Sequence, residues 1–235
     1  MYKILVKFTK QDRMKFLSHL ELIRVVERAL RRADIALKFS QGFNPHPKIS
    51  FAAPLAVGVS SEGEYLTVEI EEKIDSNDFQ KKLNMELPKG IKFIKCKYVD
   101  TKTKSLMSIV EDSTYVVKCY TQRDYQYNEI SRILEKFLQR NEIFYEKVGK
   151  KNKVRTVDIR KHIKEAIILA LEDKEIIFKI TTSTGSQGNL KPEIVIEKLV
   201  ELEGVAMDLE KLRVHRLETF SSKGDRKLIP IDSII

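Results

Sequence analysis

Apolar and polar residues alternate along most of this chain with two clear periods, one typical of strands and one typical of helices. Residues 3–8 and 64–70 alternate at every second position, which predicts half-buried strands. Ser18-His19-Leu20-Glu21 is a capping-box sequence and predicts a helix start. Apolar residues then recur at helical spacing as far as Ala33. The first hundred residues therefore predict strands at 3–8, 36–39, 49–55, 63–70 and 91–99, and helices at 18–34 and 76–87, the second with Ser76 as its N-cap.

The second half repeats this order of elements. Two strand patterns flank Glu172-Asp173-Lys174, which predicts a hairpin. Pro192 occupies the first turn of a predicted helix, where a missing N–H is tolerated. This half predicts strands at 114–121, 143–148, 163–171, 175–182 and 212–220, and helices at 128–139 and 192–202.

Each half has the order β-α-β-β-α-β, which is the order of a ferredoxin-like sandwich with both helices on one face of an antiparallel sheet. We therefore predict an α+β protein built from two tandem ferredoxin-like sandwiches. The predicted domains cover residues 1–100 and 113–220, with a linker at 101–112, a basic insertion at 149–162 in the second domain, and a tail at 221–235.

Composition narrows the class of partner. The apolar fraction of 42% supports a folded protein with a core, and the net charge of +9 favours a polyanion such as nucleic acid. No apolar run is long enough to cross a bilayer, and Met1 leads directly into a strand pattern, so we expect a cytoplasmic protein without a membrane partner. Cys96 and Cys119 stand in separate strands without metal spacing, and we expect reduced thiols and no metal or cofactor bound by this chain.

One face of the first predicted helix is rich in arginine. Arg24, Arg28, Arg31 and Arg32 follow the spacing i, i+4, i+7 and i+8, so they share one side of the helix. Arginine suits bidentate contacts to phosphate, and we predict that this face binds RNA. The alternative is a solvated face on which Glu21 and Glu27 neutralise the arginines.

The segment between residues 41 and 51 has a specified backbone, because Pro45 and Pro47 fix φ and restrict the residues before them. Stiff polar loops between regular elements are common places for binding sites. The alternative is a shaped crossover whose two phenylalanines fill the core. As a unit, the loop predicts RNA contacts from Lys38, Phe43, Asn44, His46 and Lys48, with Phe43 stacking on a base.

Two further segments suggest anion contacts. The densest basic run includes Lys150, Lys151, Lys153 and Arg155 and is typical of an electrostatic arm for RNA, or of a solubilising loop. A glycine-rich segment runs into the helix that begins at Pro192, which predicts an anion site or a simple connection between elements. Its candidate anion-binding residues are Gly185, Ser186, Gly188, Asn189 and Lys191.

Signatures of catalysis are weak. His19 and His46 are the candidates for an acid–base pair in metal-free RNA cleavage, although His19 lies in the capping box. Asp158 lies close in sequence to Arg155 and Arg160, which indicates local ion pairing.

The runs 13–21, 42–51, 55–65, 157–160 and 185–192 resemble the radical SAM-linked family of bacterial proteins, a domain of unknown function. The resemblance covers nearly the whole chain. It implies a separately encoded radical SAM protein as partner, carrying an iron–sulfur cluster and SAM, and an RNA or ribosome setting. This chain lacks the three-cysteine cluster motif, so the radical chemistry is expected to belong to that partner. More distantly, tandem ferredoxin-like units are similar to CRISPR repeat-processing endoribonucleases.

The sequence therefore predicts a non-catalytic RNA-binding accessory module that acts with a radical SAM enzyme on tRNA or rRNA rather than on DNA. Two alternatives stay open: a metal-free endoribonuclease that uses His46 or His19, and a protein–protein adaptor without an RNA role.

Overall fold

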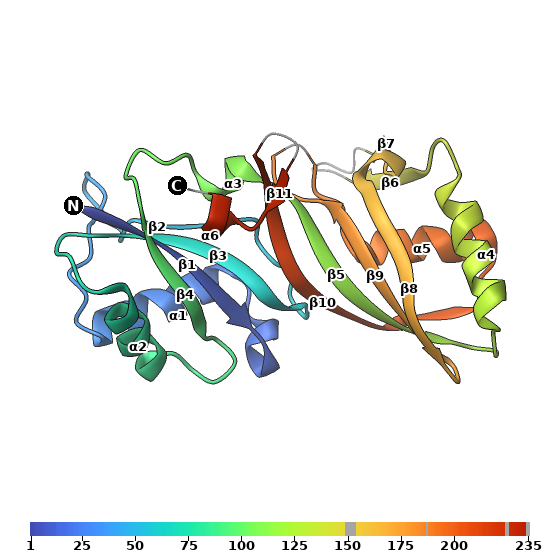
Figure 1. The fold of residues 1–235 in the computed structure, drawn as a ribbon, viewed down its shortest axis with the longest axis horizontal. Helices are drawn as coiled ribbons and strands as arrows, with labels where there is room; N and C mark the ends of the chain where they lie inside the picture. The colour runs from blue at the N-terminus through green and yellow to red at the C-terminus, as the bar shows by residue number, and fades with distance from the viewer. Residues whose placement is uncertain (149–153, 187, 224–225, 234–235) are drawn as a thin grey trace. The chain divides into compact units, whose positions relative to one another are not determined.

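The computed structural model describes residues 1–148, 154–186, 188–223 and 226–233. The chain has a mixed α+β fold dominated by antiparallel sheet, with several helices (Figure 1). It divides into two compact units, each considered separately below. Unit 1 comprises residues 1–111 and 216–235, and unit 2 comprises residues 112–215. Among the described residues, no helix is long and apolar enough to cross a membrane.

The sheet of unit 1 has the strand order β4-β1-β3, and both β2 and the second half of β10 lie next to β3. The pairs β1–β3, β1–β4 and β2–β3 are all antiparallel. Gly63 permits the close approach of β10, because a Cβ there would lie 2.5 Å from the Cα of Glu218. The elements of unit 1 are β1 (Tyr2–Lys10), α1 (His19–Arg32), β2 (Ile49–Phe51), β3 (Ser60–Ile70), α2 (Ser76–Glu86), β4 (Phe93–Val99), α3 (Leu106–Ile109), β11 (Arg226–Leu228) and α6 (Pro230–Ser233).

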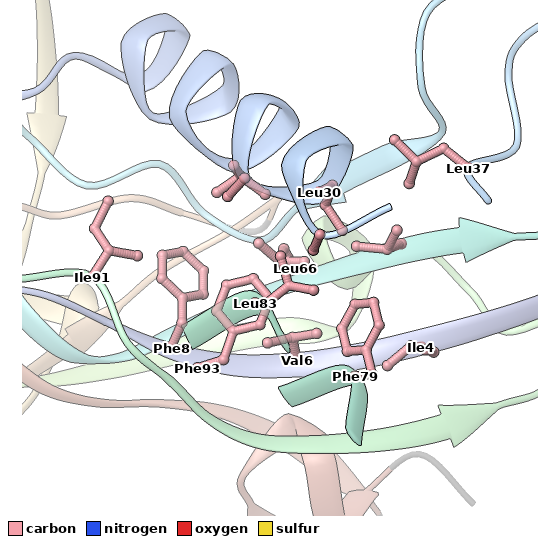
Figure 2. Close-up of a cluster of buried hydrophobic side chains, with 14 of the residues drawn as sticks. Ile4, Val6, Phe8, Leu30, Leu37, Leu66, Phe79, Leu83, Ile91 and Phe93 are labelled. Carbon is pink, nitrogen blue, oxygen red and sulfur yellow. The ribbon is translucent and has the colours of Figure 1, made fainter. Parts of the chain in front are cut away.

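The main core of unit 1 lies between its sheet and the helices α1 and α2 (Figure 2). Alternate residues of β1, namely Ile4, Val6 and Phe8, are fully buried in it. Leu30 of α1 and Phe79 of α2 pack into the same cluster, so both helices cover one face of the sheet. The period-two and period-3.6 patterns of the sequence are confirmed here.

A second cluster covers the other face of the unit 1 sheet. Leu5 and Tyr65 pack there with Leu106 of α3 and Val110, and with Ile231 of α6, which is fully buried. Residues 101–112 were predicted to be a linker, and residues 221–235 were predicted to be a tail. Both segments instead supply core side chains, because the sheet has a second apolar face that the strand alternation did not reveal as buried.

Unit 2 has the strand order β10-β5-β9-β8, with the first half of β10 beside β5. The pairs β5–β9 and β8–β9 are antiparallel, and β8–β9 is the predicted hairpin. The helices α4 and α5 contact each other and the strands β8 and β9. The elements of unit 2 are β5 (Val110–Thr121), α4 (Tyr127–Leu138), β6 (Phe144–Val148), β7 (Val154–Asp158), β8 (Ile163–Glu172), β9 (Glu175–Ser183), α5 (Pro192–Glu203) and β10 (Met207–Lys223), of which β5 begins, and β10 ends, in unit 1.

Several predicted elements differ in detail. Residues 36–39 form two isolated bridges, Leu37 with Ile70 and Phe39 with Pro47, rather than a strand. Asp75, not Ser76, caps α2, because its carboxylate accepts hydrogen bonds from two backbone N–H groups of the first turn. The strand predicted at 143–148 pairs with β7 in a separate two-stranded sheet. Most of the predicted basic insertion at 149–162 is therefore β7 and a short 3-10 turn, and its residues 149–153 lie outside the described part.

The two cysteines are both free, as expected. Cys119 is fully buried and Cys96 is half-buried. Burial raises the pKa of each thiol to about 12, so both are protonated and unreactive near neutral pH.

Candidate nucleic-acid interface

The arginines of α1 face solvent, because the opposite face of the helix packs into the core of unit 1. The predicted capping box is formed: the Ser18 side chain accepts a hydrogen bond from the Glu21 N–H, and the Glu21 carboxylate accepts one from the Ser18 N–H at 2.8 Å. Those hydrogen bonds lower the pKa of Glu21. The arginine side chains at 24, 28, 31 and 32 are all exposed.

These arginines do not share one environment. Arg32 forms an ion pair with Glu86 of α2 at 2.8 Å, so its charge is already partly neutralised. Arg24, Arg28 and Arg31 make no ion pair with any residue that the structure describes. The alternative, in which Glu21 and Glu27 neutralise this face, is supported by no ion pair among the described residues, but the charge of Arg24 helps to lower the pKa of Glu21. Three guanidinium groups without an ion pair among the described residues therefore lie on one side of α1.

The loop that follows α1 is closed by hydrogen bonds at its base. The Ser40 N–H donates to the His46 carbonyl at 2.8 Å, and the Lys48 N–H donates to the Lys38 carbonyl at 2.8 Å. The His46 N–H also donates to the Ser40 hydroxyl at 3.0 Å. Phe43 projects from this closed loop with an exposed fraction of 112%, so its whole ring meets solvent. An isolated, fully exposed aromatic ring on an ordered loop is suited to stacking on a base.

The loop and the arginine face are joined by one contact. The guanidinium carbon of Arg31 lies 6.0 Å from the centre of the Phe39 ring, at the start of the loop. The lysines of the loop are less available than the sequence predicted. Lys48 lies 3.6 Å from the carboxylate of Glu69, and the Lys38 ammonium lies 2.6 Å from the sulfur of Met1.

The two candidate catalytic histidines have different surroundings. His19 is half-buried, and its ring packs edge-on against Phe51 with the ring centres 5.3 Å apart. Phe51 also contacts Phe8 of the core, so it fills space rather than offering a stacking surface. His46 is exposed on the loop. No contact between described residues brings His19 and His46 together.

A buried charged cluster lies close to His19, and the sequence analysis did not anticipate it. The Arg216 guanidinium donates to the Glu64 carboxylate at 2.9 Å and to the Ala53 carbonyl at 3.3 Å. Lys10, only 1% exposed, donates to the Leu17 carbonyl at 2.8 Å. Burial lowers the pKa of Lys10, while the nearby Glu64 raises it and Arg216 lowers it further. A small cavity of about 10 Å³ lies against Lys10, His19 and Glu64.

Beside that cluster, Glu218 of β10 contacts two side chains and the Thr219 N–H. Its carboxylate accepts a hydrogen bond from the Tyr65 hydroxyl at 2.8 Å and pairs with the Lys7 ammonium. Burial and the adjacent carboxylate both raise the pKa of Tyr65, so its hydroxyl remains a donor. The signal that could have identified both clusters is the presence of charged residues inside strand patterns, where one face must be buried.

In unit 2 the glycine-rich segment packs directly on an imidazole. A Cβ on Gly188 would lie 2.6 Å from Cε1 of His162, so any other residue here would have to displace the His162 ring. The predicted anion cradle is reduced, because the Leu190 N–H bonds the Ser183 carbonyl and Pro192 has no N–H. Of the other candidates, Ser186, Asn189 and Lys191 are exposed, and Gly185 adopts φ +102°.

The basic run is described only in part. Arg155 is exposed on β7, whereas Lys150, Lys151 and Lys153 lie outside the described residues. The ion pairing expected around Asp158 is replaced by backbone contacts. Its carboxylate accepts hydrogen bonds from the Ile143 and Arg160 N–H groups, and these lower its pKa. The Arg160 guanidinium donates instead to the Leu138 and Ile163 carbonyls.

Residues 3–192 match the model of a bacterial family described as an uncharacterized protein conserved in bacteria (DUF2344). This chain belongs to the DUF2344 family. The match covers residues 3–111 of unit 1, without its C-terminal segment 216–235, and covers unit 2 as far as the start of α5. No curated protein matches the sequence.

Several solved structures are similar in fold to this DUF2344 chain. A Cbf5-Nop10-Gar1 complex contains a chain that matches with a TM-score of 0.53 and 13% identity, covering 92% of this chain and 48% of the other. The archaeal box H/ACA sRNP Nop10-Cbf5 complex matches with a TM-score of 0.50, 13% identity, and coverage of 91% and 46%. An H/ACA RNP bound to a substrate RNA containing 2'-deoxyuridine matches with a TM-score of 0.50, 12% identity, and the same coverage. The DUF2344 chain spans about half the length of these chains, and at this identity the likeness is one of fold.

The five sequence runs that carry the family resemblance meet at two places in the DUF2344 fold. His19, Phe51, Leu55 and Glu64, from the first three runs, line the small cavity of unit 1. Residues 157, 159 and 188–191, from the last two runs, line a larger cavity in unit 2. Sequence reasoning found these segments but not their convergence, because the contacts join residues that are far apart in the chain.

Proposed function

We propose that this chain is a non-catalytic RNA-binding module in which unit 1 holds the RNA. Arg24, Arg28 and Arg31 contact phosphates, and Phe43 stacks on a base. The observation that carries the proposal is the Arg31–Phe39 contact at 6.0 Å, which connects the arginine face of α1 to the loop that bears Phe43. A cationic face beside an exposed aromatic ring is the usual combination for single-stranded RNA.

The charge of the whole chain is consistent with this role. A net charge of +9 favours association with polyanions, and each phosphate contact adds a salt-dependent increment to the affinity. Among the solved structures of similar fold, one contains a substrate RNA. That likeness adds support at the level of fold and says nothing about which residues of this chain contact RNA.

The fold interpretation beneath the proposal is that each unit is a ferredoxin-like sandwich. Two observations support it. The strand orders β4-β1-β3-β2 and β10-β5-β9-β8 both follow the order 4-1-3-2, counted within each β-α-β-β-α-β unit. In unit 1 both helices cover one face of the sheet. On this interpretation, β6 and β7 are a hairpin inserted into the second unit.

Photochemical cross-linking provides a direct test with residue resolution. Trypsin cleaves after Lys38 and Lys48, so the loop is released as one peptide, residues 39–48, that contains Phe43 and His46. We expect ultraviolet irradiation of the protein with single-stranded RNA to shift this peptide by the mass of a nucleotide. RNA cross-links found only outside unit 1, or none at all, would contradict the proposed interface. The matched control is the Phe43→Ala protein, in which the cross-link on this peptide is expected to weaken.

The radical SAM protein stays part of the proposal as a partner, resting on the family resemblance alone. Its test is recovery of a radical SAM protein with the affinity-tagged chain from a native bacterial extract. Recovery that persists after ribonuclease treatment supports direct contact between the two proteins. Recovery that is lost after ribonuclease treatment indicates bridging by RNA, and no recovery in either case removes the partner from the account.

A further inference from the structure

Unit 2 contains a cavity that the RNA contacts of unit 1 do not use. It has a volume of about 700 Å³ and lies between the β6–β7 hairpin, residues 188–191 and the first turns of α5. Cavities that hold small molecules commonly measure about 300–1,000 Å³, so this one is large enough for a ligand of nucleotide size.

The floor of the cavity is apolar and its side walls are charged. Ile159 and Leu190 are buried, and they contribute to the floor. Two exposed lysines, Lys147 on β6 and Lys191 just before α5, line the same space. Neither lysine forms an ion pair with a residue in the described part of unit 2. An apolar floor beside two available ammonium groups suits a ligand with a flat apolar body and an anionic end.

Three glutamates supply hydrogen-bond acceptors in the lining, Glu146 on β6 and two on α5. Glu193 and Glu197 are one helical turn apart on α5 and both line the cavity. Burial and the neighbouring Glu193 raise the pKa of Glu197, whereas the charges of Lys191 and Lys198 lower it. Burial, Lys161 and Lys164 lower the pKa of His162, so its imidazole is neutral at pH 7 and keeps a nitrogen acceptor. Gly188 holds the loop against this ring.

We propose that this cavity binds one nucleoside 5'-monophosphate unit, either as a free nucleotide or as the 5'-phosphorylated end of an RNA strand. The base lies on the floor formed by Ile159 and Leu190. The phosphate meets the ammonium groups of Lys147 and Lys191, which act as point charges toward its oxygens. The ribose hydroxyls donate to the carboxylates of α5, which carry acceptors at the spacing of one turn. This site is separate from the RNA contacts proposed for unit 1, so either proposal can fail without the other.

Calorimetric titration with AMP, adenosine and inorganic phosphate tests the assignment. AMP is expected to bind about tenfold or more tightly than adenosine, because a charge-assisted phosphate contact has no counterpart in the nucleoside. Inorganic phosphate alone is expected to bind more weakly than AMP, because it does not cover the apolar floor. The absence of saturable AMP binding by the folded protein would overturn the proposal, and so would equal affinity for AMP and adenosine.

The decisive variant replaces both Lys147 and Lys191 with Ala. It is expected to reduce the ratio of AMP to adenosine affinity toward one while leaving adenosine binding in place. The control is Lys174→Ala, an exposed lysine in the β8–β9 turn that does not line the cavity, and its ratio should equal that of the unmodified protein. If the double variant keeps the full preference for AMP, the phosphate is not held by these lysines and the proposal is rejected.

A pair of short RNAs distinguishes the two sources of the ligand. The probes share one sequence and differ only in a 5'-phosphate or a 5'-hydroxyl. If the cavity holds an RNA end, the 5'-phosphorylated strand binds more tightly and AMP competes with it. If AMP binds and the two strands bind equally, the ligand is a free nucleotide. Both results support the proposed site. In either case, the Lys147 and Lys191 double variant must lose the preference for AMP over adenosine.

Discussion

The Arg31 guanidinium stands over the ring of Phe39, 6.0 Å from its centre, and this contact joins the last turn of α1 to the loop that follows it. The loop base is fixed by hydrogen bonds between Lys38, Ser40, His46 and Lys48, so the segment that carries Phe43 leaves and rejoins unit 1 at the same place. All of these residues belong to unit 1. Phosphate contacts and base stacking are therefore expected to act together on one strand of RNA.

Replacement of Phe43 by Ala separates the stacking contribution from the electrostatic one. The loss of one stacked base is expected to weaken RNA binding by about 1–3 kcal/mol, while the salt dependence stays unchanged because no charge is removed. Fluorescence anisotropy with labelled single-stranded RNA measures both quantities. Tyr127→Ala removes another exposed aromatic side chain, from α4 in unit 2, and should have no effect. Equal losses in the two variants would contradict a specific role for Phe43.

The buried ion pair of Arg216 on β10 and Glu64 on β3 is expected to stabilise the position of β10 in the sheet of unit 1. Both side chains are nearly inaccessible, at 4% and 7% exposure, and their contact measures 2.9 Å. Arg216→Met leaves the Glu64 carboxylate buried without this partner, so the free energy of unfolding should fall by about 3–5 kcal/mol. Denaturant unfolding followed by circular dichroism measures the change.

The double replacement of Arg216 and Glu64 by Met provides the control for that measurement. Because it removes both charges, its loss should be much smaller than that of Arg216→Met. A double variant that is as unstable as the single one would show that packing, rather than the buried charge pair, accounts for the stability.

Lys10 is expected to make the free energy of unfolding depend on pH in the alkaline range. Burial lowers the pKa of its ammonium from the ordinary value of 10.5, so in the window between the lowered pKa and 10.5 the unfolded chain binds more protons than the folded chain. The free energy of unfolding attributable to Lys10 therefore rises as pH rises through that window. In Lys10→Met this rise should disappear, whereas Lys92→Met, at an exposed position, should retain it. A Lys10→Met protein with the full alkaline rise would contradict the assignment.

The regular part of the fold follows from local rules, and the sequence predicts it well. The alternation at residues 3–8 and the capping box at Ser18 depend on neighbours in the chain, and both are present in the structure. The burial of Ile231 and Leu106 could not be predicted in this way. Their burial depends on the second face of the unit 1 sheet, which is covered by segments distant in sequence.

The same distinction between local sequence and tertiary contacts applies to the candidate sites. The exposure of Arg24, Arg28 and Phe43 agrees with what periodicity and loop chemistry indicate. The ion pair between Lys48 and Glu69 could be predicted only with knowledge of the strand pairing, because the two residues are far apart in the chain. The packing of Gly188 on His162 could be predicted only from the tertiary structure of unit 2. The glycine-rich segment, which the sequence suggests as an anion site, lines one wall of a cavity.

If the arginine face of α1 binds phosphates, the salt dependence of the affinity for RNA must change when these arginines are removed. Replacing Arg24, Arg28 and Arg31 together by Ala should preserve the helix, since Ala has the highest helix propensity. The slope of log affinity against log salt should fall by about 0.7–0.9 for each lost contact, or about 2–3 in total. A variant with Lys81, Arg132 and Lys174 replaced by Ala loses the same charge from exposed positions elsewhere and should keep the original slope. An unchanged slope in the arginine variant, or an equal fall in both variants, would contradict the claim.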